Sequence, residues 1–204
     1  MGLRPTDIEK IMEIPEDPTK IEQQRTVFRR TLERYVPESG YRSAGSARIL
    51  NLGCGRSYEA RPLNQYFGDG TDSRKVIVVG IDKNEEQIER SRVLYRGLSQ
   101  YVFIRGDIAR QPELIDGEFD VIVARHHTAI AAPDEWNQIF RESKKVLKPE
   151  GILIATSFQD IEHTAIRTQA EKVGYRVILD CKNECSIPIT KHVGLDRNIL
   201  IARH

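Results

Sequence analysis

Short apolar stretches alternate with helical patterns along most of this chain, and that alternation limits the possible folds more than any other feature. The predicted strands are 48–52, 75–81, 101–104, 119–124 and 152–156, and the predicted helices are 58–67, 84–99, 133–147 and 160–173. Strands that alternate with helices need crossover connections, which bring successive strands together in parallel. The order therefore predicts an α/β fold: a mostly parallel sheet with helices on both faces.

Both ends of the chain depart from this alternation. At the C-terminal end, predicted strands 175–181 and 198–202 are joined by a loop without a helical period, which predicts an antiparallel pair. At the N-terminal end, an amphipathic helix over 19–35 begins after Pro18 and ends before Pro37, and a Ser- and Gly-rich junction follows it. We therefore predict an N-terminal helical arm over 1–46 and a main domain over 47–204.

Composition excludes several classes of protein. The 31 Lys and Arg residues nearly balance the 30 Asp and Glu residues, so the net charge of +1 gives no overall reason to bind nucleic acid or a membrane surface. No apolar run approaches the ~18 residues of a membrane span, and the first residues resemble no targeting signal. Three cysteines are too few and odd in number for a disulfide framework, which favours a reducing cytoplasm.

The segment after the first predicted strand carries the first sign of a binding site. Gly53 and Gly55 allow the backbone to bend sharply there, and the next helix would direct its amides toward a ligand. A turn that merely needs glycine would look the same. Asp82 comes directly after the second strand, where a carboxylate can accept hydrogen bonds from both ribose hydroxyls. Alternatively, Asp82 could be an acid near the N-terminus of the next helix that complements the helix dipole. This role is less favoured because Asn84 is the better cap for that helix.

A second acid stands at the end of the third predicted strand. Asp107 could accept a hydrogen bond from the exocyclic amine of an adenine, and Ile108 could contact the ring. Because the carboxyl ends of parallel strands meet at one edge of a sheet, three strand ends would converge on one adenosine.

The segments ILNLGCG, VVGID, FIRGDI, FDVIVARHH and KKVLKPEGILIATS occur in this order between 48 and 202. With them the sequence resembles the class I S-adenosylmethionine-dependent methyltransferases, whose Rossmann-like fold has seven strands and a C-terminal antiparallel hairpin. The resemblance implies that S-adenosylmethionine is the cofactor, with Gly53 and Gly55 under its methionine part, Asp82 at the ribose, and Asp107 and Ile108 at the adenine. Asn51, Cys54, Lys83 and Arg125 complete the set of expected cofactor-binding residues.

The sequence departs from that family at two positions. Asn51 stands where many members have an acid, and Ser57 stands where many have a third glycine. A nicotinamide-dependent dehydrogenase would share the glycine turn and the ribose acid, but GCGRSY lacks the third glycine that dinucleotide binders use for close helix packing. An aminopropyl transferase would need an acidic cluster after FDVIVA, where the sequence has none.

Two histidines follow the fourth predicted strand and are the candidate catalytic residues. Neutral His126 or His127 could remove a proton from a hydroxyl or amine acceptor, or accept a hydrogen bond from it. Alternatively, one packs under the helix of Trp136 and the other is a loop residue. Arg125 could instead bind an acidic acceptor or the cofactor's carboxylate. We expect no metal site, because Cys181, Cys185, His163 and His192 match no familiar zinc spacing.

Missing motifs narrow the choice of acceptor. No NPPY-like segment follows the fourth strand, no Pro-Cys nucleophile for cytosine is present, and the double-acid loop of protein arginine methyltransferases is absent. We therefore expect methylation of oxygen or nitrogen in a small molecule. Two alternatives stay open. An RNA or protein substrate could dock on the Arg-rich helix with Arg25, Arg29, Arg30 and Arg34, or the protein could be a catalytically silent cofactor-binding scaffold.

Overall fold

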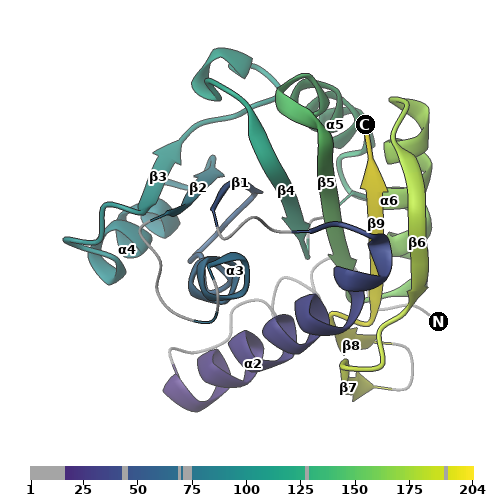
Figure 1. Ribbon diagram of the computed structural model, residues 1–204, viewed down its shortest axis with the longest axis horizontal. Coiled ribbons are helices and arrows are strands. Elements are labelled where there is room, and N and C mark those ends of the chain that lie inside the picture. The colour runs from purple at the N-terminus through teal and green to yellow at the C-terminus, as the bar shows by residue number, and fades with distance from the viewer. Residues whose placement is uncertain (1–16, 43–45, 69, 71–74, 127–128, 191–192) are drawn as a thin grey trace.

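The computed structural model describes residues 17–42, 46–68, 70, 75–126, 129–190 and 193–204. Its centre is a seven-stranded sheet with the strand order β3-β2-β1-β4-β5-β9-β6 (Figure 1). The strands are β1 (Ala47–Leu52), β2 (Val76–Asp82), β3 (Tyr101–Arg105), β4 (Phe119–Arg125), β5 (Leu147–Ser157), β6 (Arg176–Lys182) and β9 (Asn198–Arg203). This is the predicted Rossmann-like sheet.

The strand order reverses at β1. β1 pairs in parallel with β2 on one side and with β4 on the other, so that Asn51 lies beside Gly80 and Val123. β9 runs antiparallel to both β5 and β6, which confirms the predicted C-terminal pair. A ligand crevice forms at such a reversal, outside the carboxyl ends of the strands.

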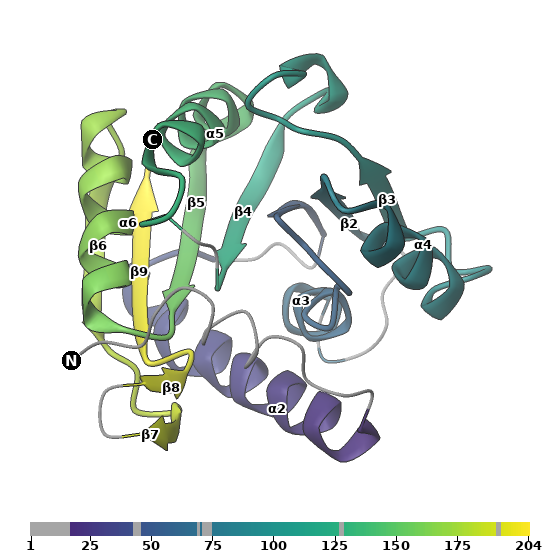
Figure 2. The same cartoon turned by 180° about the vertical axis from the view of Figure 1, so that it is seen from behind.

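Helices cover both faces of the sheet, as predicted. One face carries α2 (Pro18–Tyr35), α3 (Ala60–Phe67) and α4 (Glu85–Leu94), and the other carries α5 (Pro133–Val146) and α6 (Asp160–Lys172), which Figure 2 shows in front. The β strands supply near-continuous Val and Ile runs because both of their faces are buried. Two separate hydrophobic cores result, one on each side of the sheet.

The first described helix packs directly onto the sheet core. Asp17 caps α2 by accepting a hydrogen bond from the Thr19 amide at 2.9 Å, and Pro18 occupies the first turn. Phe28 and Leu32 are fully buried in the same core as residues of β1, β4 and β9. Its buried face therefore helps to cover the sheet.

Several elements differ in extent from their predictions. α4 ends at Leu94 rather than at 99, with Gly97 at a positive φ of 81° shortly after it. β5 is longer than predicted, and β3 and β4 are joined through a short 3-10 helix, Pro112–Leu114. A second sheet, β7 (Ile187–Thr190) with β8 (Val193–Leu195), was not predicted because its strands are short and one contains a proline.

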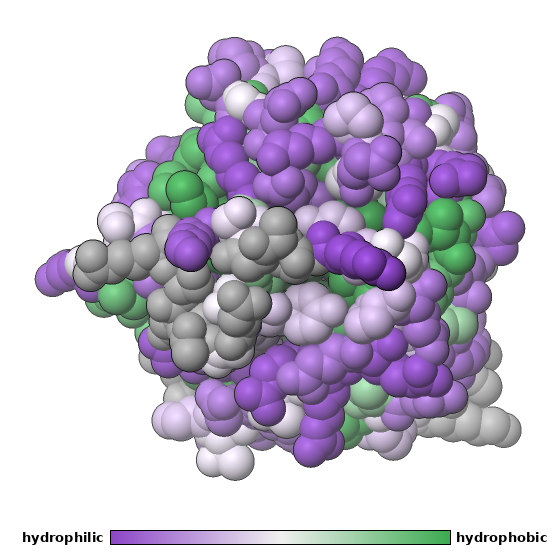
Figure 3. Space-filling model, in the orientation of Figure 1, coloured by the Kyte–Doolittle hydropathy of each residue, from purple (hydrophilic) through white to green (hydrophobic). Residues whose placement is uncertain are grey.

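The surface in Figure 3 is largely hydrophilic, with separate small apolar areas. Within the described ranges, no helix combines the length and the apolar composition that a membrane span needs.

Candidate active site

The glycine turn after β1 is held against the end of β2. Gly53 and Gly55 have φ angles of 59° and 49°, values that favour glycine. The Cys54 amide donates to the Ile81 carbonyl at 3.1 Å, so the turn is fastened to the neighbouring strand. A Cβ atom at Gly53 would lie 3.5 Å from the Trp136 ring, which shows how closely α5 covers this turn.

Asp82 receives two backbone amides. Its Oδ2 accepts from the Gly55 amide at 2.9 Å, and its Oδ1 accepts from the Asn84 amide at 2.8 Å. An ionised carboxylate has about four lone-pair directions, so two remain for further donors. The amides fix the carboxylate at the strand end, where it can accept from a pair of neighbouring hydroxyls.

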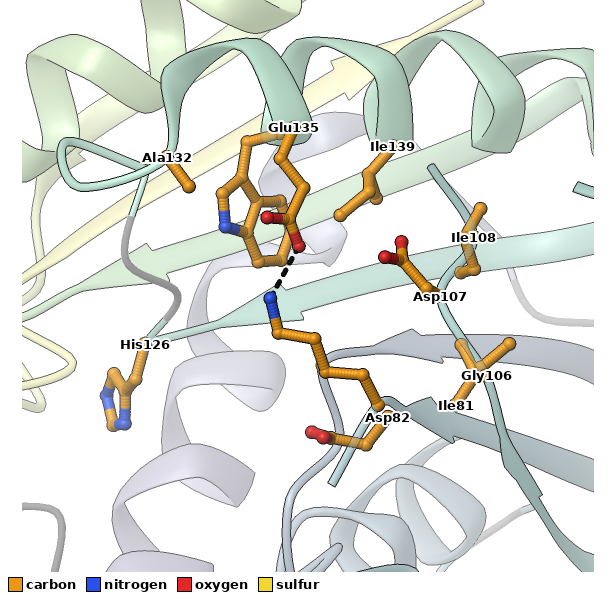
Figure 4. A pocket seen from close by; sticks show the side chains of 12 residues that line it. Ile81, Asp82, Gly106, Asp107, Ile108, His126, Ala132, Glu135 and Ile139 are labelled. Atoms are coloured by element: carbon orange, nitrogen blue, oxygen red, sulfur yellow. Dashed lines mark hydrogen bonds and ion pairs between the residues drawn. The ribbon is translucent and has the colours of Figure 1, made fainter. Parts of the chain in front are cut away.

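A cavity of about 200 Å³ opens beside Asp82 at the carboxyl ends of β1, β2 and β4 (Figure 4). In Figure 4, His126 stands at one side of the cavity, and Asp107 and Ile108 stand at the other. The lining residues are Gly53, Ile81, Asp82, Lys83, Gly106, Asp107, Ile108, His126, Ala132, Glu135, Trp136 and Ile139. The structure thus brings together six of the residues predicted to bind the cofactor or to catalyse: Gly53, Asp82, Lys83, Asp107, Ile108 and His126.

Asp107 and Ile108, the residues predicted to contact adenine, line one end of the cavity. Asp107 accepts from the Ala109 amide at 3.0 Å, which orients its carboxylate, and Ile108 is buried. Ile81 and Ile139 supply further apolar surface. The contact of Asp107 and Ile108 with an adenine ring stays a prediction, consistent with this apolar lining and with the carboxylate of Asp107 beside it.

An ion pair spans the same cavity. Lys83 Nζ lies 2.7 Å from Glu135 Oε1, drawn as the dashed line in Figure 4, and this hydrogen bond raises the pKa of Lys83. The lysine was predicted, whereas Glu135 was not. The position of Glu135 in the first turn of α5 explains it equally well as an acid that complements the helix dipole.

The polar groups of this cavity favour a cationic ligand over a dinucleotide. Asp82, Asp107 and Glu135 line it with one lysine, Lys83, which leaves an excess of negative charge. In addition, the Gly55 amide, a type of donor that dinucleotide binders use for pyrophosphate, is already bound to Asp82. The positive sulfonium of S-adenosylmethionine suits this lining, and the residues present fit that group.

Asn51 and Cys54 are buried behind the turn. Asn51 donates from Nδ2 to Glu59 Oε1 at 2.7 Å, while its Oδ1 has no hydrogen-bond partner among the described residues. Burial raises the pKa of the Cys54 thiol, which is unfavourable for a nucleophile. Neither side chain belongs to the cavity lining, so their contacts with the cofactor stay predictions.

Arg125 lies in a buried network of charges at the ends of β4 and β9. Its Nε and Nη2 lie 2.9 Å and 2.8 Å from the two carboxylate oxygens of Asp196, and Nη1 lies 3.8 Å from Glu59. The guanidinium also stacks over the Phe28 ring of α2. Because the guanidinium is bound in this way, the predicted contact of Arg125 with the cofactor stays a prediction without support from the cavity lining.

His126 connects this network to the cavity. Its Nε2 lies 2.8 Å from Asp196 Oδ1, and its ring stacks on Phe158 with centroids 3.8 Å apart. Burial lowers the pKa of His126 below its usual value; Asp196 opposes the shift, and Arg125 adds to it. The imidazole is therefore neutral near pH 7, as a general base must be. His127 lies outside the described residues.

Sequence reasoning missed Asp196, Glu59 and Glu135. Asp196 belongs to a loop between two short strands, and Glu59 directly precedes α3, so neither follows a strand of the predicted parallel order. The positive φ of Asp196 is not readable from the sequence. Only the folded chain brings Asp196 to Arg125 across 71 residues.

Comparisons with known proteins identify the family of this chain and other proteins of the same fold. The profile of the methyltransferase domain family matches residues 44–196. The PH0226 protein from Pyrococcus horikoshii OT3 is 20% identical with a TM-score of 0.63, over 94% of this chain and 92% of that one. An S-adenosylmethionine-dependent methyltransferase from Clostridium acetobutylicum ATCC 824 is 11% identical with a TM-score of 0.66, over 87% and 91%.

A third solved structure was determined with the cofactor. The magnesium protoporphyrin IX methyltransferase ChlM from Synechocystis PCC 6803, with bound S-adenosylmethionine, is 15% identical with a TM-score of 0.60 over 88% of this chain and 80% of that one. A comparison with curated proteins found no match. The family profile covers most of the chain, so the protein belongs to the methyltransferase domain family and is an S-adenosylmethionine-dependent methyltransferase of the Rossmann-like fold.

Proposed function

We propose that this enzyme methylates an oxygen or nitrogen atom of a small molecule in the cytoplasm, and that His126 takes up the proton that the acceptor loses. The observation that carries the proposal is that one cavity joins the acid-lined cofactor region to a buried, neutral histidine. ChlM, a magnesium protoporphyrin IX methyltransferase, has the same fold and is consistent with a small-molecule acceptor.

Bound S-adenosylmethionine supplies a methyl group on a positively charged sulfur. The residues of this chain have three tasks around it. Asp82 and Asp107 would hold the nucleoside by its hydroxyls and its amine, Gly53 and Trp136 would lie beside the methionine part of the cofactor, and His126 would take up the acceptor's proton. Alignment of donor and acceptor supplies most of the rate of such a displacement, and the base matters when the acceptor carries a proton.

The Arg-rich face of α2 supports a small acceptor over a nucleic acid. Arg25 lies 3.5 Å from Glu22, Arg29 lies 3.5 Å from Glu33, and Arg34 pairs with Glu38. These acids offset much of the positive charge that phosphates would need. The helix is therefore better explained as a solvated, ion-paired surface.

A methylation screen tests the proposal. The purified protein is incubated with methyl-labelled S-adenosylmethionine and, in separate reactions, with a metabolite pool, an RNA pool and a peptide pool. We expect label in the metabolite fraction alone. Label in RNA or peptides would contradict the small-molecule acceptor. Calorimetric binding of the cofactor without label in any pool would favour the silent scaffold.

A further inference from the structure

His126 and Asp196 share an unusual backbone conformation and contact each other. Their φ angles are 56° and 50°, and Ser57 is the other non-glycine residue of the described chain with a positive φ. Side chains rarely adopt this conformation, and residues that do so often cluster at functional sites. Asp196 is also fully buried, although a buried carboxylate is costly unless several donors surround it.

The donors around Asp196 keep it ionised. Arg125 binds both carboxylate oxygens, and Thr156 Oγ1 donates to Oδ1 at 2.6 Å. Burial alone would raise the pKa of Asp196, but Arg125 and then His126 hold it far below its ordinary range. An ionised carboxylate oxygen therefore lies 2.8 Å from His126 Nε2.

This contact determines which ring nitrogen of His126 carries the proton. If Nε2 were unprotonated, its lone pair would face the lone pairs of an ionised carboxylate, which is repulsive. The Asp196 amide is directed at the same nitrogen and would donate to an unprotonated Nε2 at 3.3 Å, but the carboxylate oxygen is closer, at 2.8 Å, and a charge-assisted bond to it is the stronger of the two. Nε2 is therefore the protonated nitrogen, and it donates to Asp196.

The other ring nitrogen is left with its lone pair. Among the described residues, none forms a hydrogen bond with His126 Nδ1. The ring cannot turn freely, because it stacks on Phe158, whose amide donates to the buried carboxylate of Glu162 at 2.8 Å. A neutral, immobilised imidazole with an unprotonated Nδ1 is suited to accept a proton.

We propose that Asp196 is a positioning residue for methyl transfer, which holds His126 as the Nε2–H tautomer so that Nδ1 accepts the acceptor's proton. When Nδ1 is protonated, the carboxylate stabilises the resulting imidazolium, and Arg125 limits this stabilisation so that the resting ring is neutral. The inference rests on the proposed function, because it assigns a supporting residue to the base named there.

Ring-nitrogen NMR tests the tautomer without any acceptor. In the wild-type protein with S-adenosylhomocysteine, we expect the Nε2–H form of His126, identified by the signals that disappear in His126→Asn. Asp196→Asn should change the tautomer or mix the two forms. A matched control exists at the surface, where His163 Nε2 lies 2.6 Å from Asp180 Oδ1: Asp180→Asn should alter His163 alone. An Nδ1–H ring in the wild-type protein would overturn the proposal, even if Asp196→Asn failed to fold.

Kinetics with the acceptor found in the screen give a second readout. Asp196→Asn should lower kcat by about 10²-fold with little change in KM or in affinity for S-adenosylhomocysteine. The acidic limb of its pH profile should move to lower pH, because the removed carboxylate raises the pKa of His126 while Arg125 and burial, which lower it, are still present. An unchanged kcat and an unchanged limb would refute the role of Asp196. If NMR shows the Nε2–H tautomer but no pool is methylated, the proposed function fails and the histidine–aspartate arrangement stands.

Discussion

The carboxyl edge of the sheet has two halves that are built in different ways. At the ends of β1, β2 and β3, the acids Asp82 and Asp107 are held by backbone amides and face an open cavity. At the ends of β4 and β5 and in the loop before β9, Arg125 and Asp196 form a buried ion pair, and Glu59, which precedes α3, lies 3.8 Å from the same guanidinium. His126 belongs to both halves.

The two halves are suited to different roles, one to ligand binding and the other to support of His126. Acids bound by amides of their own turns keep free lone pairs for a ligand, and their loss leaves no buried charge behind. Charges that neutralise each other in the interior are bound to each other, and they can act on a ligand only through a neighbour such as His126. We therefore expect substitutions in the first half to affect binding, and those in the second half to affect stability and chemistry.

The largest expected effect is on stability in the buried half. Arg125→Met would leave Asp196 and Glu59 buried without their cation, and breaking a buried pair in this way costs about 3–5 kcal/mol. Denaturant unfolding measures the change. Asp82→Ala, the matched variant in the open half, loses two amide hydrogen bonds but leaves no buried charge, so it should lower the free energy of unfolding by only about 1–2 kcal/mol. Equal losses for the two variants would show that the halves do not differ.

A second stability effect depends on pH. Burial raises the pKa of Glu162 to about 7, from 4.5 when exposed. The folded protein therefore binds more protons than the unfolded chain between these two values, so this group lowers stability as the pH rises from 4.5 to about 7. The full shift corresponds to about 3 kcal/mol.

Glu162→Gln removes this titration. The free energy of unfolding of the variant minus that of the wild-type protein should be larger at pH 8 than at pH 5. Only the wild-type protein carries a destabilising buried charge at the higher pH. Thermal unfolding at both pH values measures the difference. A difference of the opposite sign would mean that the carboxylate is better stabilised by the Phe158 amide than its burial suggests.

The smallest effect is expected at the ion pair across the cavity. The side chains of Lys83 and Glu135 are 66% and 31% exposed, and exposed pairs contribute about 0–1 kcal/mol. Lys83→Gln should therefore change the free energy of unfolding by less than about 1 kcal/mol. High salt should remove the difference in stability between this variant and the wild-type protein. A loss of stability as large as that of Arg125→Met would show that the charged residues of the open half depend on one another as strongly as those of the buried half.

The sequence was sufficient to predict which strand ends and which of their residues line the cavity of the open half, although it did not predict Glu135. Strand periodicity predicts β1, β2 and β3, and the rule that ligands bind at the carboxyl ends of such strands points to Gly53, Asp82 and Asp107. Each of these residues lies at the end of its strand or just after it. Because the carboxyl ends of parallel strands meet at one edge of the sheet, these residues lie close together in space. The capping role of Asn84 could also be predicted, and its side chain accepts from the Gln87 amide at 3.2 Å.

The buried half could not be predicted in the same way. Asp196 meets Arg125 only because β9 inserts beside β5, and a pattern of residues does not specify which loop arrives there. Arg125 was expected to bind an acid, but the acid belongs to the chain itself. Ion pairs between residues far apart in the sequence depend on how the strands are placed in the sheet. The pattern of residues in one sequence does not show this placement.

We expect the open half to bind the cofactor, whereas His126 and the buried half serve proton transfer. Calorimetric titration of S-adenosylhomocysteine into Asp82→Ala and His126→Asn, with the wild-type protein as reference, tests this division between the two halves. On the proposed role of Asp82 as acceptor of both ribose hydroxyls, Asp82→Ala should weaken binding at least about tenfold. His126→Asn keeps a residue that tolerates positive φ and should bind within about twofold of the wild-type protein. If the histidine variant loses as much affinity as the aspartate variant, binding and proton transfer are not divided between the two halves.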